Sequence, residues 1–201
     1  MDRTEIIRRR YNRVAHVYDW MDVIIRDKWR QEVYKGLSGH ILEVGVGTGR
    51  NIPFYPKDGF VTAIDFSPNM LEKAKERLKQ YQANAELLLM DAQQMEFEDN
   101  SFDAVVTTCV FCSVPDPIKG LKEIRRVVKP NGTIRMLEHM RSDQPMMGKM
   151  MDMINPLVVG MIGANINRDT MKNLELAGFK LKNEHRILGS IYRLITLDPN
   201  K

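Results

Sequence analysis

The apolar run at residues 41–44 is followed at once by glycines at every second position: Gly45, Gly47 and Gly49. Glycine lets a backbone turn tightly and approach a ligand closely. Such a loop after a strand is typical of sheets that bind nucleotide-like ligands at their strand ends. The spacing is G-x-G-x-G, and Arg50 stands where the dinucleotide fingerprint needs a glycine, which argues against a nicotinamide oxidoreductase. Taken alone, the loop is also compatible with a plain strand-to-helix turn.

Strand-like runs alternate with helical ones after residue 40. We expect strands at 41–44, 60–64, 85–90, 102–108 and 133–138, and a closing antiparallel pair at 179–186 and 190–197. Helices are expected at 67–80, with Ser67 as N-cap, and at 115–128. This alternation predicts an α/β fold, a Rossmann-like doubly wound sheet of about seven strands, mostly parallel, with N-terminal helices in front. The chain has 201 residues, which suits a single domain.

Acidic residues follow the next two expected strands. Asp65 ends the second strand, where a carboxylate can accept hydrogen bonds from both hydroxyls of a ribose. Asp91 and Ala92 follow the third, where the carboxylate can accept from an adenine amino group and the Ala92 amide can donate to the ring. Each acid alone could equally be a turn or helix cap. Together with the glycine loop they predict an adenosine-binding edge.

Several motifs of the sequence together resemble those of a known family. The motifs are the glycine loop, Asp65-Phe66-Ser67-Pro68-Asn69-Met70, Asp91-Ala92, Ser101-Phe102-Asp103 and Val128-Lys129-Pro130-Asn131-Gly132. In this combination the chain, from about Tyr11 to its end, is similar to the class I S-adenosylmethionine-dependent methyltransferases, in the group that includes the ubiquinone and menaquinone enzymes. The resemblance implies an enzyme with S-adenosylmethionine as cofactor.

Within the superfamily three resemblances point to different methyl acceptors. The glycine loop is similar to that of bacterial phosphatidylethanolamine N-methyltransferases, which implies a phospholipid acceptor. Cys112-Ser113-Val114 and Leu137-Glu138-His139 resemble membrane-associated thiol S-methyltransferases. Tyr18-Asp19 with Met21 resembles the early segment of quinone C-methyltransferases. A phospholipid amine is the first choice, a quinone or a small thiol the alternative, and a non-catalytic cofactor-binding module the alternative of another class.

The resemblance also implies roles for individual residues. Glu43 and the loop Gly45, Gly47 and Gly49 would hold the methionine part of the cofactor, and Phe66 and Met70 would flank its adenine. Thr108, with Cys109, follows the fourth strand and is expected to line the pocket.

Methyl transfer needs mainly position and desolvation, and a base only where the acceptor arrives protonated. His139, just past the fifth strand, is the first candidate for that base because imidazole titrates near neutrality. Tyr18 and Asp19 come next, because the leading helix can fold over the cofactor. A capping histidine and a core tyrosine are the plainer alternatives.

The N-terminal segment is basic and amphipathic. Ile7, Tyr11, Val14 and Tyr18 recur at helical spacing, and a further helix is expected over residues 22–35. We expect residues 1–36 to form a lid or membrane-contacting segment on a methyltransferase domain at 37–201. The arginines near the start would meet an anionic bilayer while Ile6, Ile7 and Tyr11 enter its interface.

Composition adds limits on partners. The net charge of +4 comes from widely spread Lys and Arg, which gives no argument for nucleic acid. The two cysteines, Cys109 and Cys112, indicate reduced buried thiols and no metal site. With no signal peptide evident, we expect a cytoplasmic protein, peripheral on the inner face of the membrane. Methionines crowd residues 136–171, and we expect an acceptor lid at about 140–166.

Overall fold

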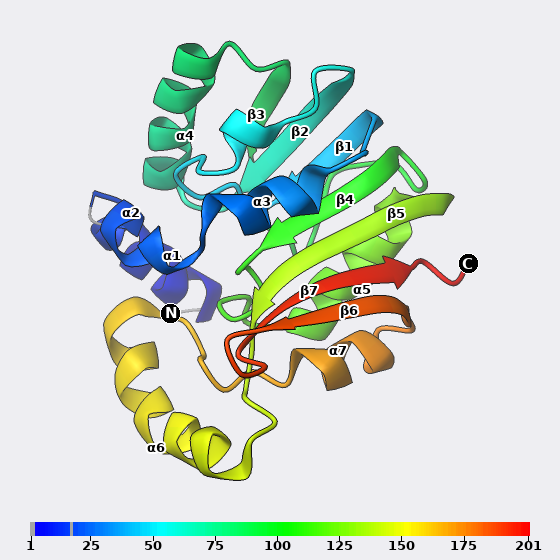
Figure 1. The fold of residues 1–201 in the computed structure, drawn as a ribbon. Helices are drawn as coiled ribbons and strands as arrows, with labels where there is room; N and C mark the ends of the chain where they lie inside the picture. Colours follow the sequence, from blue (N-terminus) through cyan, green and yellow to red (C-terminus); the bar gives the residue numbers. More distant parts are fainter. Residues whose placement is uncertain (1–2, 17) are drawn as a thin grey trace.

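A seven-stranded sheet organises the protein. The structure is a computed structural model that describes residues 3–16 and 18–201. The strands are β1 (Gly39–Val44), β2 (Gly59–Asp65), β3 (Ala85–Leu89), β4 (Phe102–Thr108), β5 (Val128–His139), β6 (Lys180–Ile187) and β7 (Tyr192–Asp198). Their order is β3-β2-β1-β4-β5-β7-β6 (Figure 1). β1 to β5 are parallel, and β7 is antiparallel to both β5 and β6, so the expected doubly wound sheet with a closing hairpin is confirmed.

Helices cover both faces of this sheet. The helical elements are α1 (Arg3–Val14), α2 (Tyr18–Met21), η1 (Asp22–Ile24), α3 (Asp27–Tyr34), η2 (Ile52–Phe54), α4 (Pro68–Tyr81), α5 (Pro117–Val127), α6 (Pro145–Ile162) and α7 (Thr170–Leu176). Buried side chains of α3 and α4 share one apolar cluster with the sheet, and those of α5 and α7 share the other. Because a core lies on each face of the sheet, central strand residues such as Ile41, Val61 and Val105 are fully buried.

The binding edge follows from strand order. The chain runs from β1 outward to β2 and β3, then returns to place β4 on the other side of β1. In open α/β sheets, ligands bind at such a reversal, outside the carboxyl ends of the strands. Here that point lies between β1 and β4, whose ends carry the glycine loop and Thr108.

Local signals explain the best-placed helices. Ser67 caps α4 by accepting a hydrogen bond from the Met70 amide at 3.3 Å, and Pro68 fits its first turn. Asp116 caps α5 in the same way through the Lys119 amide at 3.0 Å.

Three expected elements differ from the structure. The stripe from Ile7 to Tyr18 is divided, because α1 ends at Val14 and Tyr18 opens α2. The helix expected over 22–35 is a single 3₁₀ turn followed by α3. β5 already begins at Val128, where it pairs with Phe102, so the Pro-Asn-Gly segment lies inside a strand with a register shift and not in a turn. Residues 1–2 and 17 lie outside the described residues.

The segment after β5 contains α6, which was expected only as a lid. In residues 3–16 and 18–201, no helix is long and apolar enough to cross a membrane.

Candidate active site

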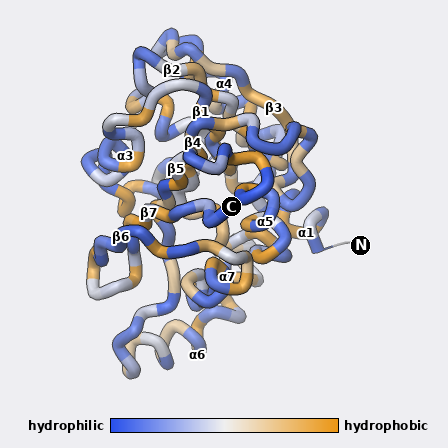
Figure 2. Tube along the Cα trace, turned by 90° about the vertical axis from the view of Figure 1, so that its right-hand side faces the viewer, coloured by the Kyte–Doolittle hydropathy of each residue, from blue (hydrophilic) through white to orange (hydrophobic). Residues whose placement is uncertain are grey.

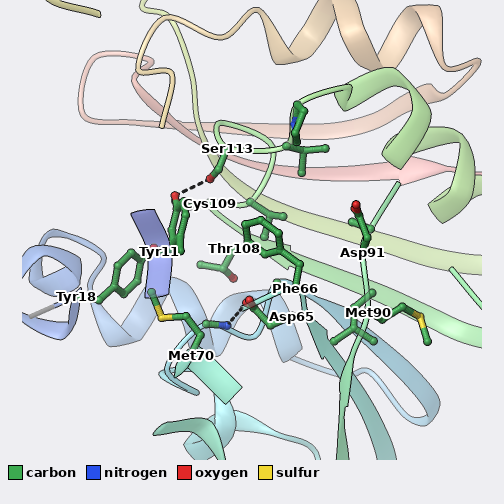
Figure 3. Close-up of a pocket in the computed structure, with 17 residues that line it drawn as sticks. Tyr11, Tyr18, Asp65, Phe66, Met70, Met90, Asp91, Thr108, Cys109 and Ser113 are labelled. Carbon is green, nitrogen blue, oxygen red and sulfur yellow. Dashed lines mark hydrogen bonds between the residues drawn. The ribbon is translucent and has the colours of Figure 1, made fainter. Parts of the chain in front are cut away.

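A pocket opens at the β1–β4 reversal and encloses about 620 Å³ of atom-free space, part of it open to solvent. It brings together the following predicted residues: Tyr18, Gly45, Gly47, Asp65, Phe66, Met70, Asp91, Ala92, Thr108 and Cys109. The residues that line it without having been predicted as site residues are Tyr11, Ile64, Met90, Val110, Ser113, Val114 and Pro115. Strand ends scattered over the sequence therefore meet at one cleft (Figure 3).

The glycine loop shapes the floor of this pocket. Gly45 (φ 75°) and Gly47 (φ 55°) adopt the left-handed conformation. A Cβ on Gly45 would meet Val110 Cγ2 at 2.4 Å, whereas a Cβ on Gly47 would enter open space. The bare backbone at Gly47 therefore leaves room where a ligand can contact the loop.

Asp65 is fixed from two sides by backbone amides. The Gly47 amide donates to Oδ2 at 2.9 Å (Figure 3). The Ser67 amide donates to Oδ1, also at 2.9 Å. Burial raises the pKa of Asp65 to about 6 despite these bonds. A carboxylate has about four lone-pair sites, so acceptor capacity remains for two ligand hydroxyls.

Asp91 is held by Gln93, a residue that the sequence argument missed. The Gln93 amide donates to Asp91 Oδ1 at 2.8 Å, and the Gln93 side-chain Nε2 lies 3.0 Å from Oδ2. Gln93 Oε1 in turn accepts from the Asp116 amide at 2.9 Å. Gln93 therefore links the adenine edge expected at Asp91 to the start of α5.

Aromatic rings from the N-terminal segment close over the pocket. Tyr11 lies 6.0 Å from Tyr18 and 5.9 Å from Phe66, ring centroid to centroid. The hydroxyl oxygens of Tyr11 and Ser113 are 2.6 Å apart (Figure 3). Ile7 is buried as well. The expectation that Ile7 and Tyr11 enter a bilayer is therefore wrong, because both face inward.

Glu43 lies behind the loop. It is fully buried, accepts from Asn51 Nδ2 at 2.6 Å and also accepts from the Tyr55 hydroxyl. Asn51 Nδ2 reaches Thr108 Oγ1 at 3.0 Å as well. Glu43 is thus not among the pocket-lining residues, and its side chain is connected to the pocket through Asn51 and Thr108.

Gly49 and Asp19 hold the loop in place. A Cβ on Gly49 would meet Ile52 Cδ1 at 2.6 Å and Ala74 Cα at 3.0 Å, so this glycine allows the loop to pack on α4. Asp19 accepts from Thr48 Oγ1 and pairs with Arg77. Burial opposes the charged form of Asp19, but hydrogen bonds from Arg77 and Thr48 outweigh it and lower its pKa. Asp19 therefore ties α2 to the loop from outside the pocket.

His139 is also outside the pocket lining. Its ring packs edge-on against Tyr192, with centroids 5.0 Å apart and planes at 84°. Burial lowers its pKa to about 4, so the expectation of an imidazole that titrates near neutrality is wrong. A direct role for His139 stays a prediction from its position at the end of β5.

The neighbouring Glu138 is the polar group that the sequence argument left without a role. It is fully buried and accepts from Thr107 Oγ1 at 2.6 Å and from the amides of Val110 and Phe111 at 3.3 and 3.2 Å. Burial raises its pKa to about 7. An acid that ends the otherwise buried run Met136-Leu137 was the available signal. Glu138 fixes the loop that carries the pocket residues after β4.

Comparison with known proteins now identifies the family. A methyltransferase-domain model matches residues 42–136. A phosphatidylethanolamine N-methyltransferase of Cereibacter sphaeroides is 33% identical over 145 residues, which are 70% of this chain and 71% of that protein. The chain belongs to the class I S-adenosylmethionine-dependent methyltransferases. A demethylmenaquinone methyltransferase of Staphylococcus aureus is 34% identical over 79% of this methyltransferase and 70% of its own length. A thiol S-methyltransferase of Mus musculus is 34% identical over 72% of this chain, but only 62% of that protein is spanned.

Solved structures agree on the fold. A SAM-dependent methyltransferase of Thermotoga maritima has a TM-score of 0.70 at 21% identity, over 94% of this chain and 98% of its own. The [4+2]-cyclase SpnF has a TM-score of 0.71 at 18% identity, over 85% of this chain and 79% of its own. Since a cyclase and a methyltransferase share this fold, the acceptor must be argued from the site.

The pocket fits the family's cofactor, S-adenosylmethionine. The open space at Gly47, the unused lone pairs of Asp65 and the flat faces of Phe66 and Tyr11 offer contacts to an amino acid, a ribose and a base. The enzyme is an S-adenosylmethionine-dependent methyltransferase, and the pocket at the β1–β4 reversal is its candidate site.

Proposed function

We propose that this enzyme methylates the amine of a phospholipid such as phosphatidylethanolamine. The observation that carries the proposal is the charge of the pocket lining: its two carboxylates, Asp65 and Asp91, are assigned below to the cofactor, and the other described residues that line it have no charged side chain. None of the described residues that line it is Lys, Arg or His. A site of this kind favours an acceptor that reacts as a neutral amine and leaves as a cation over an acceptor that must become an anion.

We assign the cofactor contacts to residues of this pocket. Asp65 accepts from the ribose hydroxyls, and Asp91 with the Ala92 amide binds the adenine edge. Phe66 and Met70 flank the adenine, while the backbone at Gly45 and Gly47 binds the methionine part. When bound, the cofactor supplies an electrophilic methyl group for an in-line displacement. These residues contribute position, which can be worth about 7–11 kcal/mol in well-oriented reactions.

The aromatic rings suit an amine acceptor in particular. In each methylation the lone pair of the neutral amine forms the N–C bond as the methyl–sulfur bond of the cofactor breaks, and S-adenosylhomocysteine leaves. The ammonium formed gives its N–H proton to solvent before the next methylation, and the final product is a quaternary ammonium. The ring faces of Tyr11 and Tyr18 attract such a cation through their quadrupoles. Tyr18 can thus favour a transition state in which positive charge develops on the acceptor nitrogen.

A thiol or a quinone acceptor fits the same lining less well. A thiol must react as the thiolate and a quinol as an anionic carbon or oxygen nucleophile. Buried Cys109 illustrates the effect, because burial followed by the nearby charge of Glu138 raises its pKa well above the usual value. An anionic acceptor would meet the same penalty. One relative is named a phosphatidylethanolamine N-methyltransferase, which supports the phospholipid choice. Others are named thiol and demethylmenaquinone methyltransferases, so the assay below includes both of these acceptors.

The same proposal includes a membrane as the partner of this enzyme. A phospholipid acceptor stays in a bilayer, so the enzyme must work at the membrane surface. The arginines of α1 offer positive charge there: Arg9 and Arg13 are exposed, and the Arg8 side chain is 43% exposed. Residues 1–36 then act as the lid that connects the bilayer to the pocket.

The experiment is a methyl-transfer assay with radiolabelled cofactor and three acceptors: phosphatidylethanolamine in mixed micelles, demethylmenaquinone and an alkyl thiol. We expect label in the phospholipid fraction, with successive mono-, di- and trimethyl products. Label only in the quinone or in the thiol would overturn the proposed acceptor. Titration with S-adenosylhomocysteine serves as the control that each protein preparation binds the cofactor product.

A further inference from the structure

Helix α6 has an outer face with exposed apolar side chains, and the role inferred for this face rests on the proposed function. α6 has 18 residues and lies at the periphery of the molecule, away from the sheet (Figures 1 and 2). Large apolar side chains on it are exposed to an unusual degree, including Met146 at 86%, Met153 at 76% and Leu157 at 68%. Contiguous exposed apolar surface of this kind marks an interaction site.

These side chains form one continuous stripe. The members, called the outer stripe below, are Met146, Met150, Met153, Ile154, Leu157 and Met161. At about 100° per residue they fall within an arc of about 100°, and they run about 22 Å along the helix. The opposite face carries buried Met151 and Gly148. The helix is therefore anchored by one face and presents an apolar ridge on the other.

Charges on α6 leave the outer stripe free of acid. The acidic residue of α6 is Asp152, which lies on another face and pairs with Arg141 at 2.9 Å. Lys149 is exposed at the border of the stripe. Its long side chain can reach a headgroup while the apolar residues enter the interface.

Helix α1 adds more positive charge next to α6. Arg10 Nη1 donates to the Val159 carbonyl of α6 at 2.6 Å. Arg13 and Arg9 follow about 60° and 100° further around α1, on the side away from Tyr11. Glu5, the acidic residue of α1 among those described, is already paired with Arg8 and Arg9. Val159 lies on the face of α6 opposite the outer stripe, so α1 supports the inner face of α6, and the cation that borders the stripe is Lys149, whose charge complements an anionic lipid surface.

The end of α6 is joined directly to the pocket. The Asn165 amide donates to the Cys112 carbonyl at 2.8 Å, and Arg168 donates to the carbonyls of Phe111 and Val114 at 3.1 and 3.0 Å. Ser113, between these residues, lines the pocket. The segment that follows α6 therefore connects this helix to the pocket wall.

We infer that the outer stripe of α6 is a membrane-docking element that lies in the plane of an anionic bilayer, with Lys149 on the headgroups. The stripe replaces Ile7 and Tyr11 of α1 as the inserted group, since Ile7 is buried and Tyr11 lines the pocket. A second copy of the chain packed stripe to stripe is the competing occupant, and Lys149 at the border argues against it because like charges would meet.

The test uses Met153→Gln/Leu157→Gln in the full chain. Glutamine keeps the helix propensity and the charge but removes apolar surface. The matched control is Leu176→Gln/Leu181→Gln, which changes two exposed leucines on α7 and β6. Each protein is floated with phosphatidylcholine vesicles that do or do not contain phosphatidylglycerol, and sedimentation gives the oligomeric state.

We expect wild type and control to float with the anionic vesicles and the α6 variant to bind them about tenfold less. Equal flotation of all three proteins would overturn the inference. So would a wild-type dimer that the α6 variant dissolves without any change in flotation. A methyl-transfer assay with phosphatidylethanolamine in micelles tests the proposed function separately. If wild type transfers no methyl group to this lipid, the proposed acceptor is refuted, whereas the flotation experiment still tests membrane docking by the outer stripe.

Discussion

The hydroxyl oxygens of Tyr11 and Ser113 lie 2.6 Å apart, and they join helix α1 to the loop after β4. The two residues are 102 positions apart in sequence, so this contact joins the N-terminal helix to the middle of the chain at the pocket. We expect Tyr11→Phe to open the lid and weaken binding of S-adenosylhomocysteine about three- to tenfold, the value of one hydrogen bond of about 1 kcal/mol. Isothermal titration measures it, with Tyr81→Phe on the exposed side of α4 as control. Equal affinities would show that the contact does not hold the lid.

Asp65 should make cofactor affinity depend on pH. Its pKa is raised to about 6 in the free protein, and the carboxylate must be charged to accept from two hydroxyls. Affinity for S-adenosylhomocysteine is therefore expected to be constant above pH 7 and to fall as pH drops below about 6. Asp65→Asn should bind weakly at every pH and lose this dependence. If the asparagine variant keeps the same pH profile, another group is responsible.

Glu138 should reverse the usual effect of pH on stability. Its folded pKa of about 7 lies above the ordinary 4.5, so between these values the native state holds a proton that the unfolded chain has lost. Stability is then greatest below about pH 4.5 as far as this group is concerned, and it falls as pH rises to about 7. Glu138→Gln should flatten that decline by about 1–3 kcal/mol. Chemical denaturation at pH 5 and pH 8 provides the comparison, and parallel curves for both proteins would contradict the assignment.

His139 should matter for packing more than for proton transfer. With its pKa lowered to about 4, the imidazole is neutral throughout the physiological range. His139→Gln is expected to change kcat less than about fivefold and to leave the pH–rate profile above pH 5 unaltered. Its edge-on contact with Tyr192 is lost, so the melting temperature should drop slightly. A loss of about a hundredfold or more in kcat, with a step removed from the profile, would restore His139 as the base.

The strand ends were the part of this protein that sequence could predict well. Gly47, Asp65 and Asp91 each terminate an apolar run, and parallel strands must bring such ends to one edge. The direction of single side chains was harder. Glu138 and His139 are consecutive on β5, so one residue of register decides which faces the loop, and sequence alone does not give that register.

Helix boundaries near the N-terminus and at α6 depended on tertiary contacts. Tyr18 continues the spacing of Ile7 and Tyr11, yet it opens a new helix that Asp19 binds to Arg77, 58 residues away. α6 contains Pro156 and ends at Gly163, signals that normally argue for a loop. Its exposed methionines also gave a hydrophobic pattern that does not mark a core.

Two glycines of the same loop offer a matched comparison. Gly47→Ala and Gly49→Ala both place a side chain at positive φ, 55° and 85°, at a similar cost of about 1 kcal/mol. Their surroundings differ, since the Cβ at Gly47 enters the open pocket while the Cβ at Gly49 meets Ile52 and Ala74 of the core. We expect Gly47→Ala to lose cofactor affinity with a small change in melting temperature, and Gly49→Ala to lose about 2 kcal/mol or more of stability. Thermal melts and titration with S-adenosylhomocysteine distinguish the two. If Gly47→Ala binds as tightly as wild type, the cofactor does not contact the loop at that residue, and the assignment of the methionine subsite to it is wrong.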